Sequence, residues 1–339
     1  MRNKSEAKTV AIIGAGISGL TAARMLTDAG IKVTVFEKSR GVGGRTANRR
    51  SEHGSFDHGA QYFTVKDREF RSLVDRLISK GAVASWTNPA DPSSADIVHL
   101  NNGVISQRSL SNEKYVGTPA MNSICKHLSH EIEVVFNSRV VEVLECPGKV
   151  ELRLQGEEKA TGYDGVIIST PSFQASELTK EWPKLSAALE AIEMRPCWAC
   201  LATFEPPVTS DWVGAFLKDS HIAWIARNNT KPGRNSKTEN IVIHATTEWS
   251  QAHLKTSQHA VAEMLLEEFW LKTGLSRQPA GYLNAHLWRY AVAAEELHLE
   301  CLSSSSSNLV ICGDWAHGSR VEGAFLSGRS ASTKMLAKL

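Results

Sequence analysis

A glycine-rich turn near the N-terminus constrains the fold of this chain more than any other feature. Residues 10–13 are apolar and run into Gly14-Ala-Gly-Ile-Ser-Gly19, after which apolar residues recur at helical spacing through position 26. Glycines at Gly14, Gly16 and Gly19 allow a tight turn, close approach of a pyrophosphate to backbone N–H groups, and close packing of the helix on the strand. The pattern predicts a strand, a phosphate-binding turn and a helix.

A second strand, residues 32–36, follows Gly30 and ends at Glu37, 18 residues beyond Gly19. A crossover helix between two neighbouring strands makes the strands parallel. A carboxylate at the end of the second strand can accept hydrogen bonds from ribose hydroxyls. The opening of the chain is therefore typical of a βαβ unit that binds a dinucleotide.

Two further clusters indicate which dinucleotide is bound. The string Arg40-Gly-Val-Gly-Gly-Arg45 follows Glu37 closely, and its glycines let the backbone approach a flat ring system while Arg45 faces phosphate or flavin. Near the C-terminus, a strand at 309–312 leads into Gly313-Asp314 and a helix that begins near Val321. We expect Asp314 to hold a ribityl or phosphate group, and the positive N-terminus of this helix to face the pyrimidine edge of a reduced flavin.

Composition excludes several other classes of protein. The chain of 339 residues has 38 Lys+Arg against 36 Asp+Glu, a net charge of +2, with 42% hydrophobic residues, so neither disorder nor a nucleic-acid surface is indicated. Its six cysteines are scattered, which favours a reducing compartment. With no apolar stretch long enough for a signal or a membrane span, we expect a cytoplasmic protein with no membrane or protein partner.

The pattern of elements predicts an α/β protein with a Rossmann-type domain and an inserted α+β domain whose sheet is mixed or antiparallel. We assign residues 1–64, 132–175 and 305–339 to the dinucleotide-binding domain, and residues 65–131 and 176–304 to the substrate domain. Within this scheme a helix is expected to start at Thr118-Pro119, and residues 134–136, 140–144 and 150–154 are expected to form one meander.

The three glycine clusters, in this order, resemble the flavin-containing amine oxidase superfamily and its Rossmann-type FAD domain. Longer strings narrow the resemblance to the bacterial renalase-like proteins, over nearly the whole chain. These strings are Asp57-x-Gly-Ala-Gln-Tyr-Phe-Thr64, Val116-Gly-Thr-Pro-Ala-Met121, Ala226-Arg-Asn-Asn-x-Lys-Pro-Gly-Arg234, His244-Ala-Thr-x-x-Trp-Ser250, Trp288-Arg-Tyr-Ala291, and Cys312-Gly-Asp-Trp315 with Arg320-Val-Glu-Gly323.

The resemblance implies an oxidase with non-covalent FAD that takes hydride from the 2-dihydro and 6-dihydro isomers of NAD(P)H and reduces O2 to H2O2. Loss of hydride makes the dihydropyridine an aromatic pyridinium, so no catalytic base is needed. An amine oxidase acting on a small primary or secondary amine is an alternative, and a non-catalytic FAD-binding module is an alternative of another class. The partners expected are the dinucleotide isomers and O2.

The resemblance also implies which residues form the site. FAD contacts are expected at Gly14, Gly16, Ile17, Gly19, Glu37, Lys38, Arg40, Gly44, Arg45, Ala60, Gln61, Val140, Asp314 and Val321. Substrate contacts are expected at Tyr62, Phe63, Thr64, Val65, Lys66, at Trp198 as a stacking wall, and at His244 and Arg320. The segment Ala316-His-Gly-Ser319 departs from the family pattern.

Other chemically suggestive groups have simpler interpretations. Residues three apart on a strand face opposite sides, so Cys197-Trp-Ala-Cys200 is not expected to act in redox or zinc chemistry. The basic positions between 227 and 237 (Arg227, Lys231, Arg234 and Lys237) favour a solvated hairpin tip, with steering of substrate phosphates as the alternative. The histidines show no metal-ligand spacing, and we expect no metal site; His53, His58, His286 and His298 are interpreted as surface or core groups.

Overall fold

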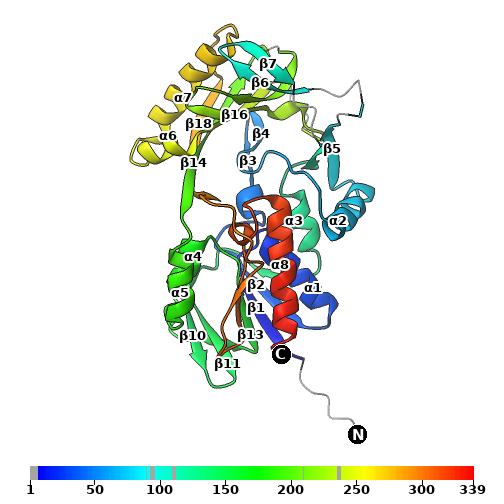
Figure 1. The fold of residues 1–339 in the computed structure, drawn as a ribbon, viewed down its shortest axis with the longest axis vertical. Helices are drawn as coiled ribbons and strands as arrows, with labels where there is room; N and C mark the ends of the chain where they lie inside the picture. The colour runs from blue at the N-terminus through cyan, green and yellow to red at the C-terminus, as the bar shows by residue number, and fades with distance from the viewer. Residues whose placement is uncertain (1–6, 89, 92–95, 109–111, 209, 235–237) are drawn as a thin grey trace.

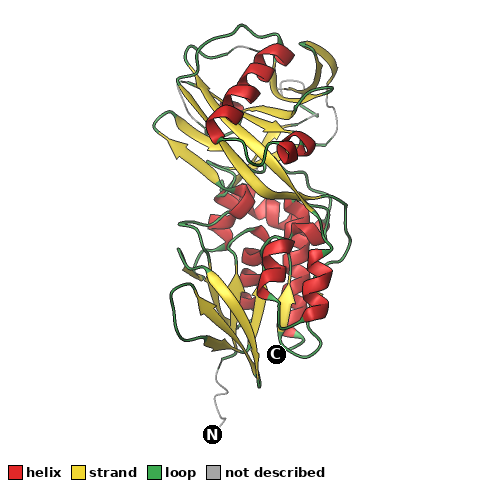
Figure 2. Cartoon of the chain, turned by 90° about the vertical axis from the view of Figure 1, so that its left-hand side faces the viewer, coloured by secondary structure: helices red, strands yellow, loops and turns green. Residues whose placement is uncertain are grey.

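A computed structural model describes residues 7–339, except 89, 92–95, 109–111, 209 and 235–237. Lys237 of the basic segment thus lies outside the described residues. Figure 1 shows two parts stacked along the long axis, the lower containing β1, α1 and α8 and the upper containing β14, α6 and α7. Turning the molecule by 90° shows the same two parts stacked along the long axis (Figure 2).

The lower part is built on a six-stranded sheet whose strands come from distant parts of the chain. Its order is β19 (Leu302–Ser303), β20 (Leu309–Ile311), β13 (Gly165–Ile168), β1 (Thr9–Ile13), β2 (Lys32–Phe36) and β9 (Glu133–Val135). All neighbours are parallel except β19 and β20. Because β1 lies between β13 and β2, the turn after β1 opens near the middle of the sheet edge.

Helices from the two ends of the chain cover one face of this sheet, and a small second sheet, together with two further helices described below, covers the other. Val10 and Ile12 of β1 pack in the core with α1 (Ile17–Asp28) and α8 (Val321–Leu336), whereas Ala11 and Ile13 pack towards β10 (Val140–Cys146) and β11 (Lys149–Leu154). Both faces of β1 are buried, which explains its continuous apolar run. A third strand, β12 (Thr161–Tyr163), completes the small antiparallel sheet.

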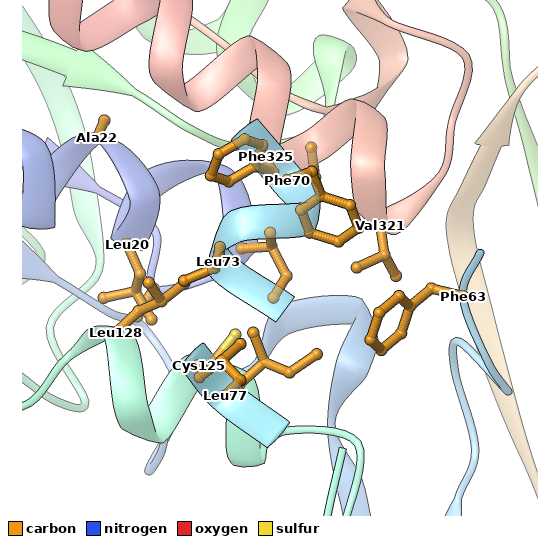
Figure 3. Packing of buried hydrophobic residues seen from close by; sticks show 14 of the residues in the cluster. Leu20, Ala22, Phe63, Phe70, Leu73, Leu77, Cys125, Leu128, Val321 and Phe325 are labelled. Carbon is orange, nitrogen blue, oxygen red and sulfur yellow. The ribbon is translucent and has the colours of Figure 1, made fainter. Parts of the chain in front are cut away.

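The helical side of the lower core also contains α2 (Arg68–Ser79) and α3 (Ser123–Leu128). Figure 3 shows Phe70, Leu73 and Leu77 of α2 lying between Leu20 of α1, Phe325 of α8 and Leu128 of α3. Asp67 caps α2 by accepting hydrogen bonds from the N–H groups of its first turn. Apolar residues every three or four positions therefore place α2 on the dinucleotide-binding part.

The upper part is a seven-stranded mixed sheet. Its order is β18 (Tyr282–Ala293), β14 (Met194–Phe204), β17 (Glu239–Ala245), β16 (Ile222–Arg227), β15 (Trp212–Leu217), β6 (Asp96–Asn101) and β7 (Val104–Arg108). Only the pairing of β15 with β6 is parallel. One face packs on α6 (Thr247–Ala252) and α7 (Gln258–Thr273), through residues such as Leu265 and Phe269.

Two antiparallel pairs of strands and three short 3-10 helices lie outside these sheets. The pairs are β3 (Asn48–Ser51) with β4 (Gly54–Asp57), and β5 (Val83–Thr87) with β8 (Lys114–Gly117). The 3-10 helices are η1 (Gly44–Thr46), η2 (Asn228–Thr230) and η3 (Asp314–Ala316). The β3–β4 pair lies between the two parts (Figure 1), and Phe56 of β4 packs on Leu201 and Val242 of the upper sheet.

The expected fold class is confirmed, since a Rossmann-type α/β sheet is joined to a second part with a mixed sheet. The domain boundaries expected from the sequence differ from the way the elements pack. From 65–131, only β6 and β7 join the upper sheet, while α2 and α3 pack on α1 and α8. The helices α4 (Ser172–Leu178) and α5 (Pro183–Glu190) belong to the lower core, so the upper part resumes near Met194. β19 lies in the lower sheet, just before the expected boundary at 304.

Two local expectations are wrong. Residues 133–135 do not join the meander, because β9 pairs with β2 at the edge of the parallel sheet. The helix expected from Thr118 begins only at Ser123, because residues 118–122 form a bend and a turn, in which the N–H of Met121 donates to the Asp57 carboxylate at 3.0 Å. The meander itself, from β10 to β12, is present.

None of the helices in the described parts of the chain combines the length and apolar content needed to cross a lipid bilayer.

Candidate active site

The glycine turn after β1 has the geometry of a phosphate cradle. Gly14 has φ +106°, and its N–H donates to the carbonyl of Phe36 at 2.8 Å. A Cβ on Gly19 would lie 2.2 Å from the Gly14 carbonyl oxygen, so only glycine allows α1 to start this close to the strand. No side chain caps α1, and the space beside Gly16 is open to 4 Å. The free N–H groups that begin with Ile17 thus face room for an anion.

Glu37 lies beside this cradle, as expected. The carboxylate is buried, and its Oε2 accepts a hydrogen bond from the N–H of Ala15 at 2.8 Å, while Oε1 accepts from Ser39 at 2.8 Å. These bonds aim the carboxylate at the end of β2, where a ribose would lie. Val140 packs in the same core as Phe36, next to Glu37, whereas the Lys38 and Arg40 side chains are exposed.

The second and third glycine clusters meet at an ion pair. Arg45 donates from Nη1 to Asp314 Oδ2 at 3.0 Å, and its Nη2 also contacts the same carboxylate. The carbonyl of Arg45 accepts a hydrogen bond from the N–H of Ala60 at 2.9 Å. Gly44 approaches the cradle, since a Cβ there would be 3.4 Å from the Cα of Gly16. Residues expected to hold one cofactor are therefore brought together from three distant segments.

The N-terminus of α8 closes another side of the site. Val321 is the first helical residue, and no side chain caps the helix. Glu322 accepts hydrogen bonds from the N–H groups of Lys66 and Asp67, both at 2.7 Å, which ties residues 64–67 to α8. Arg320 is mostly exposed and lies 3.7 Å from Glu296. Thr64, Val65 and Lys66 are thus held near the helix start by their backbone.

The upper sheet presents planar side chains to the lower part. Strand pairing places His244 of β17 on the same face as Trp224 of β16 and Ala199 of β14. His286 lies on β18, the other neighbour of β14, where it also pairs with Ala199 and so shares this face. Trp288 lies two residues beyond His286 on the same face. This face is opposite the one covered by α6 and α7.

The segment after β4 packs directly on these planar groups. His58 lies with ring centroids 4.9 Å from both His286 and Trp288, and the Trp288 indole N–H donates to the His58 carbonyl at 2.9 Å. The Tyr62 ring lies 5.4 Å from that of Trp224. His244 Nε2 is 3.1 Å from the His58 carbonyl oxygen, so this nitrogen carries the proton and donates.

The histidines of this group are neutral near physiological pH. Burial lowers the pKa of His58 to about 3, with smaller contributions from His286, Arg49 and His244. Burial also lowers the pKa of His244 to about 4. The pKa of His286 is lowered mainly by burial, and further by Arg49. The planar ring side chains that face residues 58–62 are therefore uncharged, and the cations nearby are Arg49, Lys114 and Lys231.

The structure contradicts two expected substrate contacts. Trp198 faces the helical layer: its indole N–H donates to the His253 carbonyl at 3.2 Å, and it packs in the core with Trp249 and Leu265. It cannot be the stacking wall, since neighbouring residues on a strand face opposite sides and His244 pairs with Ala199. Phe63 is 4% exposed and stacks on Tyr115 in the lower core.

The basic segment after β16 is buried rather than solvated, so the favoured interpretation of it is wrong. Lys231 and Arg234 both contact the carboxylate of Asp57, Arg234 Nη2 at 2.6 Å and Lys231 Nζ at 3.5 Å. Arg227 pairs instead with Glu239 at 3.0 Å. Burial alone would raise the pKa of Asp57, but the two cations hold it below its usual value.

Sequence analysis missed the cluster formed by Asp57, Lys231 and Arg234, and the roles of Trp224 beside Tyr62 and of Trp288 beside His58. A signal for the cluster was present, because both cations lie in Lys231-Pro-Gly-Arg234, within one of the family-like strings. Their partner Asp57 is separated from Arg234 by 177 positions along the chain. Sequence spacing alone does not indicate such a contact.

Two family models match the chain. Residues 12–77 match the NAD(P)-binding Rossmann-like domain, and residues 112–336, more than half of the chain, match the flavin containing amine oxidoreductase family. The chain belongs to this family. Membership in the flavin-containing amine oxidoreductases implies FAD as the cofactor, and the cradle at Gly16, the ribose carboxylate and the Arg45–Asp314 pair fit that dinucleotide.

Curated proteins match over short segments. Protoporphyrinogen oxidase 2 of Arabidopsis thaliana is 43% identical over 70 residues, which cover 21% of this chain and 14% of that protein. An L-amino-acid oxidase of Sistrurus catenatus edwardsii is 42% identical over 73 residues, or 22% and 14% of the two chains. The matches thus span about a seventh of each of these relatives.

Solved structures match over the whole chain. A candidate protoporphyrinogen oxidase from Exiguobacterium sp. 255-15 aligns with a TM-score of 0.77 over 98% of both chains, at 11% identity. A triple mutant of putrescine oxidase aligns with a TM-score of 0.75 over 98% of this chain and 99% of that chain, at 13% identity. At such identities the likeness concerns the fold alone.

Proposed function

We propose that this flavin-containing amine oxidoreductase is a renalase-like oxidase of the 2-dihydro and 6-dihydro isomers of NAD(P)H. The balanced reaction converts one isomer, one O2 and one proton into NAD(P)+ and H2O2. FAD, when bound, supplies the chemistry of accepting hydride and passing two electrons to O2. The protein then has to bind and orient a planar dihydropyridine and keep water away from it.

The observation that carries this proposal is the uncharged, planar surface beside residues 58–62. Tyr62, Trp224 and Trp288 offer flat apolar rings, and the nearby histidines are neutral because burial lowers the pKa of His58 and His244. A dihydropyridine ring is itself planar and neutral, so such a surface fits it. Hydride loss gives an aromatic product without removal of a proton, so no base is required.

The charge of the neighbouring cluster supports this substrate class over amines. Within the described residues, the Asp57 carboxylate contacts two buried cations, Lys231 and Arg234, and Lys231 also donates a hydrogen bond to Gln61. An excess of positive charge disfavours a bound ammonium ion. A dihydropyridine ring is neutral when it binds and does not meet this cost.

A small primary or secondary amine is the second candidate substrate. The rings of Tyr62 and Trp224 are in direct contact, with centroids 5.4 Å apart, and form an aromatic surface on which an amine can pack. The name of the matching family favours the same alternative. The positive cluster is the observation that argues against it.

The test is anaerobic mixing of the FAD-loaded protein with each candidate, following the long-wavelength flavin absorbance. Rapid bleaching by 2-dihydro or 6-dihydro NAD(P), with none by ordinary NADH or putrescine, is the expected result. Bleaching by amines alone would replace the proposal with the amine oxidase. Bleaching by none of these compounds would favour a non-catalytic FAD module.

A pair of variants tests the surface that carries the proposal. Trp288→Phe removes the indole N–H that reaches the His58 carbonyl and should slow bleaching by the isomers about tenfold, since misplacement of the reacting groups is costly. Trp212→Phe, a buried tryptophan in the core beside α7, is the matched control and should bleach at the wild-type rate. Equal rates in all three proteins would contradict the role assigned to this face.

A further inference from the structure

Lys231 is a lysine with no exposed side-chain surface. Its side chain and that of Asp57 are 0% exposed, and the Arg234 side chain is 2% exposed. Lysine is almost never fully buried unless its charge is paired, because removing an ammonium from water is costly. A chain that keeps such a group obtains something from it besides stability.

The charge of Lys231 is not balanced within its surroundings. Arg234 donates to Asp57 Oδ2 from Nε at 3.1 Å and from Nη2 at 2.6 Å, so it lies closer to that carboxylate than Lys231 does. Lys231 Nζ lies 3.5 Å from the same oxygen. One negative charge thus faces two positive charges, which leaves the cluster with a net charge of +1 when Lys231 is protonated.

The other groups around Lys231 do not cancel this charge. His244 on β17 interacts with Lys231, His58 and Tyr62 lie on the same segment as Gln61, and Lys114 on β8 lies over the Tyr62 ring. Both histidines are neutral at physiological pH, and burial, only partly offset by Arg320, raises the pKa of Tyr62 above its usual value. The Lys231 ammonium also lies 5.3 Å from the centre of the Trp86 ring, a neutral contact.

Lys231 also fixes the side chain of Gln61. Its Nζ donates to Gln61 Oε1 at 3.0 Å, while Gln61 Nε2 donates to the Gly59 carbonyl at 2.9 Å and to the Asp57 carbonyl. The amide therefore has a single favourable orientation. Because Ala60 is bonded to Arg45, Lys231 is linked through two residues to the Arg45–Asp314 pair of the cofactor site.

We propose that Lys231 is a positioning residue of the flavin site that holds residues 59–61 in place and supplies a positive charge favouring the reduced cofactor. Reduction by two electrons and one proton leaves the flavin ring with a negative charge, which a nearby buried cation stabilises. This inference rests on FAD as the family's cofactor and is independent of the substrate proposed above.

A dependence on pH follows. Burial, partly offset by Asp57, lowers the pKa of Lys231 to about 8. A negative charge on the reduced flavin raises the pKa of Lys231 above its value in the oxidised protein, so reduction is accompanied by extra proton uptake between the two values. The reduction potential of the bound flavin should therefore fall more steeply with pH above pH 8 than below it.

The experiment measures the reduction potential of the bound flavin against a reference dye, from pH 6.5 to 9.5, in the FAD-loaded protein and its variants. Lys231→Met should lower the ratio of reduced to oxidised flavin about tenfold at a fixed potential below pH 8, equivalent to about 30 mV for a two-electron couple. It should also lose the change of slope near pH 8. The control Lys255→Met, at an exposed lysine, should match the wild type.

A second variant separates charge from geometry. Lys231→Gln keeps a donor for Gln61 without the charge, so it should retain FAD as the wild type does yet show the same lowered potential as Lys231→Met. Wild-type potentials in both variants, or a change of slope that persists in them, would overturn the proposal. A wild-type potential in Lys231→Gln alone would show that the hydrogen bond matters and the charge does not, which also overturns it.

Discussion

The ammonium of Lys231 and the side-chain carbonyl of Gln61 form a buried hydrogen bond of 3.0 Å between residues 170 positions apart. It joins a loop of the upper sheet to the segment that bonds to Arg45 at the cofactor cradle. Together with the Asp57–Arg234 pair, it couples the two parts of the molecule where FAD and substrate would meet.

The stability of the protein should depend on pH through Lys231. Its pKa is about 8 in the folded protein against an ordinary value of 10.5, mainly because of burial. Between these values the unfolded chain binds more protons, so the free energy of unfolding rises with pH. Compared with Lys231→Met, the wild type should gain up to about 3 kcal/mol from pH 7.5 to 10.5.

Denaturant unfolding of both proteins at several pH values, with excess FAD, measures this difference. A free-energy difference that stays constant with pH would mean that Lys231 has an ordinary pKa in the folded protein.

Glu37→Ala should weaken FAD retention. The change removes the carboxylate placed for the ribose and leaves the N–H groups of Ala15 and Ser39 without their acceptor. We expect about a tenfold to hundredfold rise in the Kd for FAD, measured by equilibrium binding to the apoprotein. Glu158→Ala, at an exposed position, is the control. A wild-type Kd for Glu37→Ala would remove Glu37 from the cofactor site.

Gly59→Ala should separate Arg45 from residues 59–61. A Cβ at Gly59 would lie 2.0 Å from the Arg45 carbonyl oxygen, so either Arg45 or the 59–61 segment has to move. The flavin content and the thermal midpoint should both fall. Gly41→Ala, where a Cβ meets nothing within 4 Å, should change neither. Normal flavin content in Gly59→Ala would contradict the close packing of Arg45 on this segment.

Trp198→Phe should affect stability and not flavin chemistry. Loss of the indole bond to His253 and of core volume should lower the free energy of unfolding by about 1–3 kcal/mol. The rate of anaerobic flavin reduction by a substrate should stay within about twofold of the wild type, because Trp198 faces the helices. Stopped-flow absorbance measures that rate, and a tenfold decrease would restore Trp198 to the substrate site.

Local sequence patterns predicted the parts of the fold that local physics determines. The cradle from Gly14 to Gly19 depends on backbone geometry that glycine alone permits, and Glu37 lies at a fixed distance beyond it. Arg45 and Asp314 were expected to serve one cofactor, and they form an ion pair across 269 positions. In these cases the residue types that form the pattern are also the physical cause of the structure.

Long-range contacts account for what the sequence did not predict. Arg234 in a polar string looked solvated, and only its contact with Asp57 on a distant strand explains its burial. The segment before α3, which was expected to be helical, is a turn whose Met121 N–H binds the same distant carboxylate. Trp198 and His244 lie on adjoining strands, and only the pairing register shows that they face opposite sides.

The most direct test of the proposed function is the stoichiometry of an aerobic turnover. The FAD-loaded protein is supplied with a limiting amount of 6-dihydro or 2-dihydro NAD(P), and NAD(P)+, O2 and H2O2 are measured together. The proposal predicts one NAD(P)+ and one H2O2 formed for each O2 consumed, and no turnover of putrescine. Consumption of O2 with putrescine, and none with either isomer, would contradict it.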